Sequence, residues 1–372
     1  MKYSPIDLRK LTSNPNLCHL HKPSEKYQFD SVFVYEQQNE GNLNCDLHEI
    51  FSAQYRCPEV YTANLKKCIV GPRAPKLPRY WLFLWEDHYL YNFINETAKK
   101  ILKASGTLSL DGQTIEIDIK PFCSISSPCV WLYPFKNIDH LLRESLPSIL
   151  TLQELEGIDW KNLHFYCQEA TDAFINLLVS LGIRKENIID IPGKYVEFDQ
   201  LIIPCFSSFG HLHTPTRLYI KTADFIRDEV ARSGDYPKKI FVSRAKATQR
   251  KILNEDILYD GLKARGFSII EPGEFSFTKQ IELFSQAEIV VGPHGMGIAN
   301  AAFSNKLKFL LEIMNSDYIR NSYYRTAQLR NCKYGVYLCH ALDAQFNNER
   351  KTSSDVIIDR IKFFNFLDSC LN

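Results

Sequence analysis

Residues Ala287 to Phe303 combine the types and spacing that bind a phosphate group: an apolar strand, a glycine-broken turn with a histidine, and a run of small residues. The stretch 289–291 is wholly apolar, as expected of a strand buried on both faces of a parallel sheet. Glycines at 292, 295 and 297 let a ligand approach the backbone, and the helix expected next offers N–H groups and the positive end of its dipole. With His294 in the turn and Asn300 on the helix, the segment predicts a phosphate site.

Two other interpretations of this turn stay open. It is compatible with a plain strand-to-helix connection in which His294 is hydrogen-bonded internally. It is also compatible with a dinucleotide-binding fingerprint, although Asn300 stands at the third glycine position and the motif lies late in the chain. In that case Glu312, in the next apolar strand, would hold a ribose and the chain would be an NAD(P)-dependent oxidoreductase.

A group of cations follows the expected strand IFVSR. Ser243 and Arg244 end that strand, and Arg250 follows after a polar loop that also holds Lys246. The guanidinium group grips phosphate oxygens with a planar fork and stays charged, although a solvated basic loop is the alternative. Because the carboxyl ends of parallel strands share one edge, we expect these cations and the glycine turn to border one crevice and to bind a diphosphate.

A histidine and a carboxylate lie on one face of the helix expected from Asn137 to Leu155. His140 and Glu144 are four residues apart, so their side chains are neighbours on that helix. A hydroxyl nucleophile needs a base that takes its proton, and a carboxylate usually serves in sugar transfer. Glu144 is therefore a candidate general base with His140 beside it, and an ordinary exposed pair is the alternative.

The elements that must position these residues read as an α/β protein with two domains. A chain of 372 residues can form two cores, and strands alternate with helical segments in both halves, which indicates parallel sheets. The stretch Ser207 to Thr216 is rich in residues that break helices and strands, and is the candidate linker. We expect two Rossmann-like domains facing one another across a cleft, at 1–206 and 207–350, with a C-terminal helix at 351–372 that packs back on the N-terminal domain.

Composition narrows the partners and the compartment. Lys plus Arg number 44 against 43 Asp plus Glu, so no global field attracts nucleic acid or an anionic membrane. The polar N-terminus and the lack of a long apolar run favour a cytoplasmic protein. Eleven cysteines without a CxxC pair read as reduced thiols rather than metal ligands. The basic and aromatic stretch Lys66 to Phe93 is expected to be mostly core, with peripheral membrane contact as the alternative.

Three segments, taken in this order, resemble glycosyltransferase family 61, the capsular polysaccharide biosynthesis type. NIDHLLRESLPSILTL resembles its Asn-x-x-His with a carboxylate four residues later and then Leu-Pro, and IFVSRAKATQRKILNED resembles its Ser-Arg strand end with a second Arg and an Asn-Glu pair. The closing motif is matched by Gln280, Ala287, His294, Gly295, Gly297, Asn300 and Phe303, with Glu312 in the strand that follows. The resemblance spans roughly Val130 to Ile313.

That resemblance implies a GT-B fold, an inverting mechanism, a nucleotide-sugar donor that is usually UDP-linked, and no required metal or other cofactor. The N-terminal domain would bind the acceptor and the C-terminal domain the donor. Donor-binding roles would fall to Ser243, Arg244, Arg250, His294, Gly295, Met296, Gly297, Asn300 and Glu312. Catalytic roles would fall to Glu144 as the general base and His140.

Within that donor set, the resemblance implies separate tasks. Arg244 and Arg250 would offset the charge of the leaving diphosphate, and His294 with the amides of 295–297 would hold the same phosphates. Asn300 would fix the sugar or a phosphate, while Glu312 would bind ribose or brace the motif. Met296 departs from the family pattern, as do residues 298–299, and this is expected to reshape the donor pocket.

The acceptor implied by the resemblance is a glycan, such as a capsule, a lipopolysaccharide or another surface glycan, and it would then be lipid-linked. The enzyme would be cytoplasmic or peripheral at the inner membrane. A catalytically inactive subunit that binds a nucleotide sugar or a glycan is the alternative from another class of protein.

Overall fold

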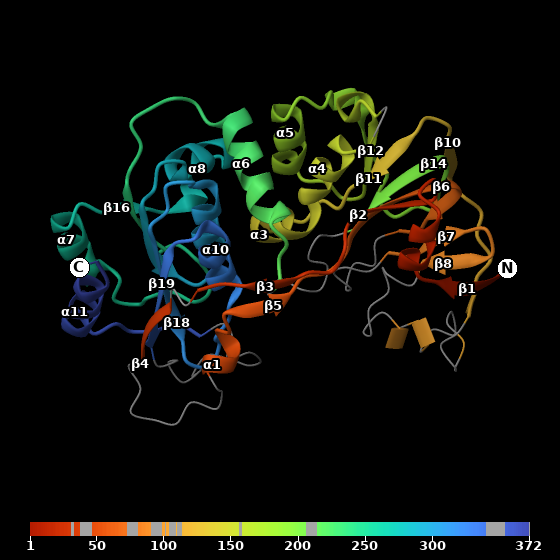
Figure 1. The fold of residues 1–372 in the computed structure, drawn as a ribbon. Helices are drawn as coiled ribbons and strands as arrows, with labels where there is room; N and C mark the ends of the chain where they lie inside the picture. The colour runs from red at the N-terminus through yellow and green to blue at the C-terminus, as the bar shows by residue number, and fades with distance from the viewer. Residues whose placement is uncertain are drawn as a thin grey trace. The chain divides into compact units, whose positions relative to one another are not determined.

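The computed structural model divides the chain into two compact units, each built around its own sheet (Figure 1). It describes residues 1–30, 33–37, 47–72, 81–90, 99–100, 102–103, 109, 114–155, 158–205, 214–339 and 354–371. Unit 1 consists of Met1–Glu25 and Cys57–Leu212, and unit 2 of Lys26–Arg56 and His213–Asn372. The protein is therefore a mixed α/β protein with two sheets, as the alternation of strands and helices predicts.

The sheet of unit 2 is wholly parallel within the described residues. Its strand order is β16-β15-β17-β18-β19-β4. The strands are β15 (Lys239–Val242), β16 (Ser268–Ile270), β17 (Ile289–Pro293), β18 (Phe309–Asn315), β19 (Lys333–Cys339) and β4 (Phe33–Gln37). If β15 to β19 are numbered 1 to 5 along the chain, their order in the sheet is 2-1-3-4-5, with β4 added at the edge beside β19. This is a doubly wound arrangement, and its topological switch point lies between β15 and β17.

Helices cover both faces of this sheet, because its central strands are apolar on both sides. Val290 and Leu310 point to the core shared with α8 and α10, while Val291 and Leu311 point to the core shared with α7 and α11. This strict alternation within continuous apolar runs is what a buried parallel strand requires. The helices are α6 (Leu218–Val230), α7 (Asp256–Ala264), α8 (Phe277–Phe284), α10 (Ser322–Arg330) and α11 (Arg360–Leu371).

The sheet of unit 1 is mixed, and only part of it follows the predicted pattern. Strands β11, β12, β13 and β14 are parallel, whereas β6 (Val60–Val70) pairs antiparallel with β14 and β7. The remaining order runs through β7, β8, β1 and β9. The bounds are β1 (Lys2–Ile6), β2 (Cys18–Lys22), β7 (Phe83–Trp85), β8 (His88–Leu90), β9 (Ile115–Glu116), β10 (Cys123–Ile125), β11 (Cys129–Trp131), β12 (His164–Cys167), β13 (Ile188–Asp190) and β14 (Val196–Pro204).

Helices accompany the parallel part of this sheet. After β11 come α3 (Ile138–His140), a π-helical turn (Leu141–Ser145) and α4 (Pro147–Gln153), and after β12 comes α5 (Asp172–Ser180). The aromatic stretch after residue 80 is core: Trp81, Phe83 and Trp85 are all buried. Within the described part of 66–93, this burial leaves no aromatic face for a membrane. Among the described residues, no helix is long and apolar enough to span one.

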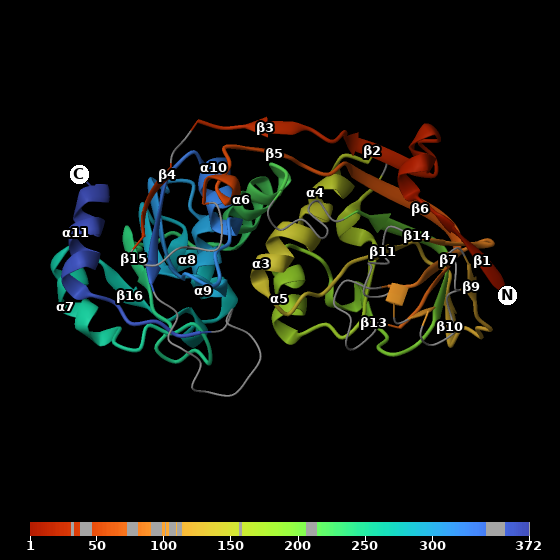
Figure 2. The same ribbon diagram turned by 90° about the horizontal axis from the view of Figure 1, so that it is seen from below.

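Two of the expected domain boundaries are wrong. The segment Lys26–Arg56, expected in the N-terminal domain, belongs to unit 2, where it contributes β3 (Lys26–Gln28), β4, α1 (Leu47–Ile50) and β5 (Gln54–Arg56). The C-terminal helix, expected on the N-terminal domain, packs in unit 2 (Figure 2). Its Phe363 and Leu367 share a core with Leu258 of α7, so burial of its apolar face fixes its place. The expected linker lies largely outside the described residues.

The contact between α7 and α11 can be tested at Gly261. A Cβ atom there would lie 2.4 Å from Cζ of Phe364, whose ring is also covered by the Arg265 guanidinium at 4.3 Å. We expect Gly261→Ala to lower the free energy of unfolding by about 1–3 kcal/mol because the helices must move apart. Gly273 has nothing within 4 Å of its would-be Cβ, so Gly273→Ala is the control and should change stability by about 0.5 kcal/mol or less. Equal urea denaturation curves for both variants would contradict this packing.

Candidate functional site

The candidate site of unit 2 lies where the strand order reverses. Ligands of doubly wound sheets bind outside the carboxyl ends of the strands at this switch point, here between β15 and β17. Arg244 follows β15, and His294 follows β17. The fold thus brings the predicted cations and the predicted glycine turn to one edge of one sheet.

The three glycines of the turn each lie where a side chain would clash with a neighbour. A Cβ on Gly292 would lie 2.7 Å from Cβ of Val242, and one on Gly297 would lie 2.7 Å from Cγ1 of the same residue. These two glycines therefore allow the turn to pack on β15. Gly295 has a φ of 155°, which only glycine adopts readily, and a Cβ there would lie 2.3 Å from Nη1 of Arg244. That glycine makes room for the guanidinium group.

The helix after the turn is shorter than expected. α9 (Met296–Ala299) has four residues and continues as a 3-10 turn through Phe303, so its dipole contributes little to anion binding. Met296 is half exposed. Asn300 is buried, and its Nδ2 donates to Oε1 of Gln280 at 2.9 Å and to the Gly297 carbonyl at 3.1 Å. Its Oδ1 is also buried and finds no partner among the described residues.

Two arginines converge on this turn. Nη2 of Arg244 donates to the Gln249 carbonyl at 2.8 Å, and the guanidinium group of Arg250 lies 5.5 Å from the Tyr318 ring. In the described part of the chain, the buried Nε of each arginine lacks a hydrogen-bond partner. Burial, and then the nearby charge of Arg250, lower the pKa of Arg244. Two crowded cations with unsatisfied donors are an environment that an anion would stabilise.

The loop that carries Arg244 is held by a carboxylate that the sequence analysis gave no role. Glu255 is buried, and its Oε1 accepts from Oγ of Ser243 at 2.5 Å and from the Tyr259 hydroxyl at 2.8 Å. Its Oε2 accepts from the backbone N–H of Arg244 at 3.1 Å. Ser243, predicted as a donor-binding residue, therefore points inward and supports the loop. Glu255 belongs to the Asn-Glu pair, Asn254 and Glu255, that resembles the family pattern, so the sequence did carry a sign of its importance.

A buried carboxylate also holds His294. Glu312 is fully buried, and its Oε1 is hydrogen-bonded to Nδ1 of His294. Its Oε2 accepts from the Tyr334 hydroxyl at 2.6 Å, and burial beside that carboxylate raises the pKa of Tyr334 well above its usual value. Of the two roles expected for Glu312, ribose binding does not fit this burial, whereas bracing the histidine does. With Nδ1 engaged, Nε2 is the ring nitrogen left for a ligand.

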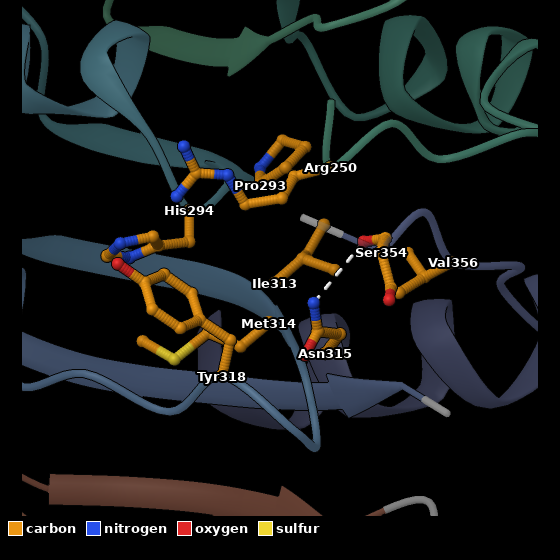
Figure 3. A pocket seen from close by; sticks show the side chains of 9 residues that line it. All are labelled: Arg250, Pro293, His294, Ile313, Met314, Asn315, Tyr318, Ser354 and Val356. Atoms are coloured by element: carbon orange, nitrogen blue, oxygen red, sulfur yellow. Dashed lines mark hydrogen bonds between the residues drawn. The ribbon is translucent and has the colours of Figure 1, made fainter. Parts of the chain in front are cut away.

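A small open pocket adjoins His294 and Arg250 (Figure 3). Tyr318 forms one wall, and its ring lies 5.4 Å from the His294 ring and 4.3 Å from the Arg320 guanidinium. The other lining residues are Pro293, Ile313, Met314, Asn315, Ser354 and Val356. Sequence reasoning missed Tyr318 because a single tyrosine after a strand carries no pattern, and it missed 354–356 because contact with the pocket depends on tertiary structure.

The predicted catalytic pair lies in unit 1 on a π-helical turn. Nδ1 of His140 lies 2.6 Å from Oε1 of Glu144, and the wider turn is closed by the Leu146 N–H donating to the Leu141 carbonyl at 2.8 Å. The His140 ring stacks on Phe135 with 5.1 Å between centroids. The Glu144 side chain is 0% exposed and that of His140 is 23% exposed. Direct contact of Glu144 with a hydroxyl substrate therefore does not fit, and His140 is the more accessible member of the pair.

Residues 138–308 match the family model described as Glycosyltransferase 61. The iron-containing dodecameric glycosyltransferase TibC from enterotoxigenic E. coli H10407 is similar at 11% identity and a TM-score of 0.29, over 68% of this chain and 75% of that chain. The heptosyltransferase TibC in complex with ADP-D-beta-D-heptose is similar at 10% identity and a TM-score of 0.30, over 72% and 77%. Among curated proteins, no sequence matches this chain.

The brace under His294 predicts a stability effect. In Glu312→Gln an amide NH₂ replaces one acceptor oxygen and faces either the Tyr334 hydroxyl or the His294 ring. We expect this to lower the free energy of unfolding by about 1–3 kcal/mol, because a buried donor loses its acceptor. The control is Glu274→Gln, which removes an exposed ion pair with Lys246 and should cost about 0–1 kcal/mol. Chemical denaturation that ranks the two variants the other way would contradict the brace.

Proposed function

We propose, since the chain belongs to glycosyltransferase family 61, that it transfers a sugar from a UDP-linked donor, with inversion, to a hydroxyl group of a surface glycan. Family membership carries the coarser statement, that the protein is a glycosyltransferase that uses a nucleotide-sugar donor. The donor's base, the stereochemistry and the acceptor are the proposed part.

One observation supports a diphosphate-binding site in unit 2. Arg244 and Arg250 both have a buried Nε without a partner among the described residues, and both lie beside the turn that carries His294. A diphosphate would supply acceptor oxygens for these donors and offset two like charges. In the transfer step the bond between the sugar carbon and the diphosphate breaks, and the leaving UDP keeps the electron pair. Cations held in place beforehand stabilise that charge as it forms.

The acceptor side of the proposal rests on the His140–Glu144 pair. We assign His140 as the base and Glu144 as the residue that positions it, because the His140 side chain is partly accessible whereas that of Glu144 is fully buried. Glu144 is hydrogen-bonded to Nδ1 and so orients the ring, and the proposed base is Nε2, which takes the proton of the acceptor hydroxyl while the hydroxyl oxygen attacks the sugar carbon. Glu144 would also stabilise the imidazolium that forms, as a carboxylate does in other histidine bases.

The donor site can be tested by calorimetry with UDP, GDP, CMP, ADP-heptose, NAD and NADP. We expect binding of UDP and its sugars, and no binding of the nicotinamide cofactors. Binding of NAD or NADP alone would favour an oxidoreductase. Binding of UDP-sugars without hydrolysis or transfer for any acceptor would favour an inactive binding subunit.

Substitution of the arginines sharpens this test. Arg244→Ala and Arg250→Ala should each weaken UDP binding about 10- to 100-fold, the effect of losing a charged hydrogen bond. Lys246 was expected among the cations of this loop, but its side chain is exposed and paired with Glu274, so it is not assigned to the diphosphate and Lys246→Ala is the matched control. Equal affinities for all three variants and the wild type would place the diphosphate elsewhere.

The roles of the catalytic pair predict different responses to added bases. His140→Ala should lower the release of UDP from a bound UDP-sugar about 10²- to 10⁴-fold without weakening donor binding. Imidazole in the buffer should restore part of that rate, because the position of the lost ring is partly accessible to solvent. Formate should not rescue Glu144→Ala, because Glu144 is fully buried. Rescue of Glu144→Ala by formate, together with no rescue of His140→Ala, would make Glu144 the base.

A further inference from the structure

Arg250 has an uncommon backbone conformation. Its φ is 56°, in the left-handed region that residues other than glycine seldom adopt. Such a conformation persists only where surrounding contacts fix it. The guanidinium group of this residue lies over Tyr318 and lines the pocket beside His294, so the same contacts also set where its charge lies.

The contacts come from the chain's C-terminal segment, residues 354–358. The backbone N–H of Lys251, the residue directly after Arg250, donates to Oδ1 of Asp355 at 2.8 Å. The Val356 N–H donates to the Lys251 carbonyl at 2.8 Å, and the Leu253 N–H donates to the Val356 carbonyl at 2.9 Å. The residue after Arg250 thus has both of its backbone polar groups bound by this segment.

The same segment is itself anchored on both sides. Nδ2 of Asn254 donates to the Ile358 carbonyl at 2.8 Å, and the Ile358 N–H donates to Oδ1 of Asn254 at 3.0 Å. Nδ2 of Asn315, at the end of β18, donates to the Ser354 carbonyl at 3.3 Å, the bond drawn in Figure 3. The segment therefore links the carboxyl end of β18 to the Arg250 loop.

We propose that Asp355 is a positioning residue for the donor site, which acts on the diphosphate through Arg250 without touching it. The carboxylate fixes the amide plane after Arg250 and so holds the left-handed turn that aims the guanidinium group. Asp355 lies outside the residues that match the family model, 138–308. This inference rests on the proposed function, because it takes Arg250 as a ligand of the diphosphate.

The test compares Asp355 with a nearby aspartate, Asp359, in the whole chain of 372 residues. Asp355→Ala should weaken UDP binding about tenfold, because a displaced cation loses its alignment with the phosphate oxygens. Asp359→Ala is the control: Asp359 also binds backbone amides, those of Ile361 at 2.9 Å and Lys362 at 3.1 Å, but at the start of α11. It should leave UDP affinity unchanged. Asp355→Asn keeps an acceptor oxygen and should restore most of the affinity, which also covers the case in which the alanine variant does not fold.

A double mutant separates positioning from direct binding. In an Arg250→Ala background, Asp355→Ala should cause no further loss of UDP affinity, because its effect passes through the missing guanidinium group. Wild-type affinity in both Asp355 variants, with Arg250→Ala weakened, would overturn the positioning role alone. An undiminished further loss in the double mutant would also overturn it. Wild-type affinity in Arg250→Ala itself would instead overturn the proposed donor site.

Discussion

The candidate donor site depends on one steric constraint, the close approach of the Arg244 guanidinium group to the backbone of Gly295. No side chain fits between them, since a Cβ there would lie 2.3 Å from Nη1. The two loops therefore meet through backbone on one side and a cation on the other. Close packing of Gly292 and Gly297 on Val242 brings the loops to this distance. The strand order then decides where they meet, at the switch point of the sheet.

Each unit uses the same device to present a histidine. His140 and His294 both turn Nδ1 toward the carboxylate of a fully buried glutamate, Glu144 and Glu312. A buried carboxylate beside a ring nitrogen fixes the tautomer and the orientation of the ring. Glu255 does the corresponding work for a backbone amide, that of Arg244. A buried glutamate that orients a histidine is thus the common feature of the two candidate sites.

Strands β15 to β18 of unit 2 were predictable from sequence, because their apolar runs alternate regularly with helices and turns, whereas β19 and β4 were not. The chemistry at the edge of that sheet was partly predictable, since Arg244 and His294 each follow a recognisable strand. The antiparallel part of unit 1 was not, because β6 and its partners are joined across stretches without a clear period. Sequence patterns also do not show which polar side chains turn inward. Glu312 and Ser243 have the types expected of ligands, and only tertiary packing shows that their polar atoms are taken by neighbours.

The membership of β4 in unit 2 has a consequence for biosynthesis. Residues 33–37 pair with β19, whose residues 333–339 are made some three hundred positions later, so this edge closes only after β19 has been synthesised. Until then the early segment has no partner strand, and a fragment that starts at the linker would leave β19 as a bare edge. Unpaired edges of this kind recruit other chains and promote aggregation. Unit 2 is therefore not separable by cutting the chain at one point, and its solubility depends on a segment from the other end of the sequence.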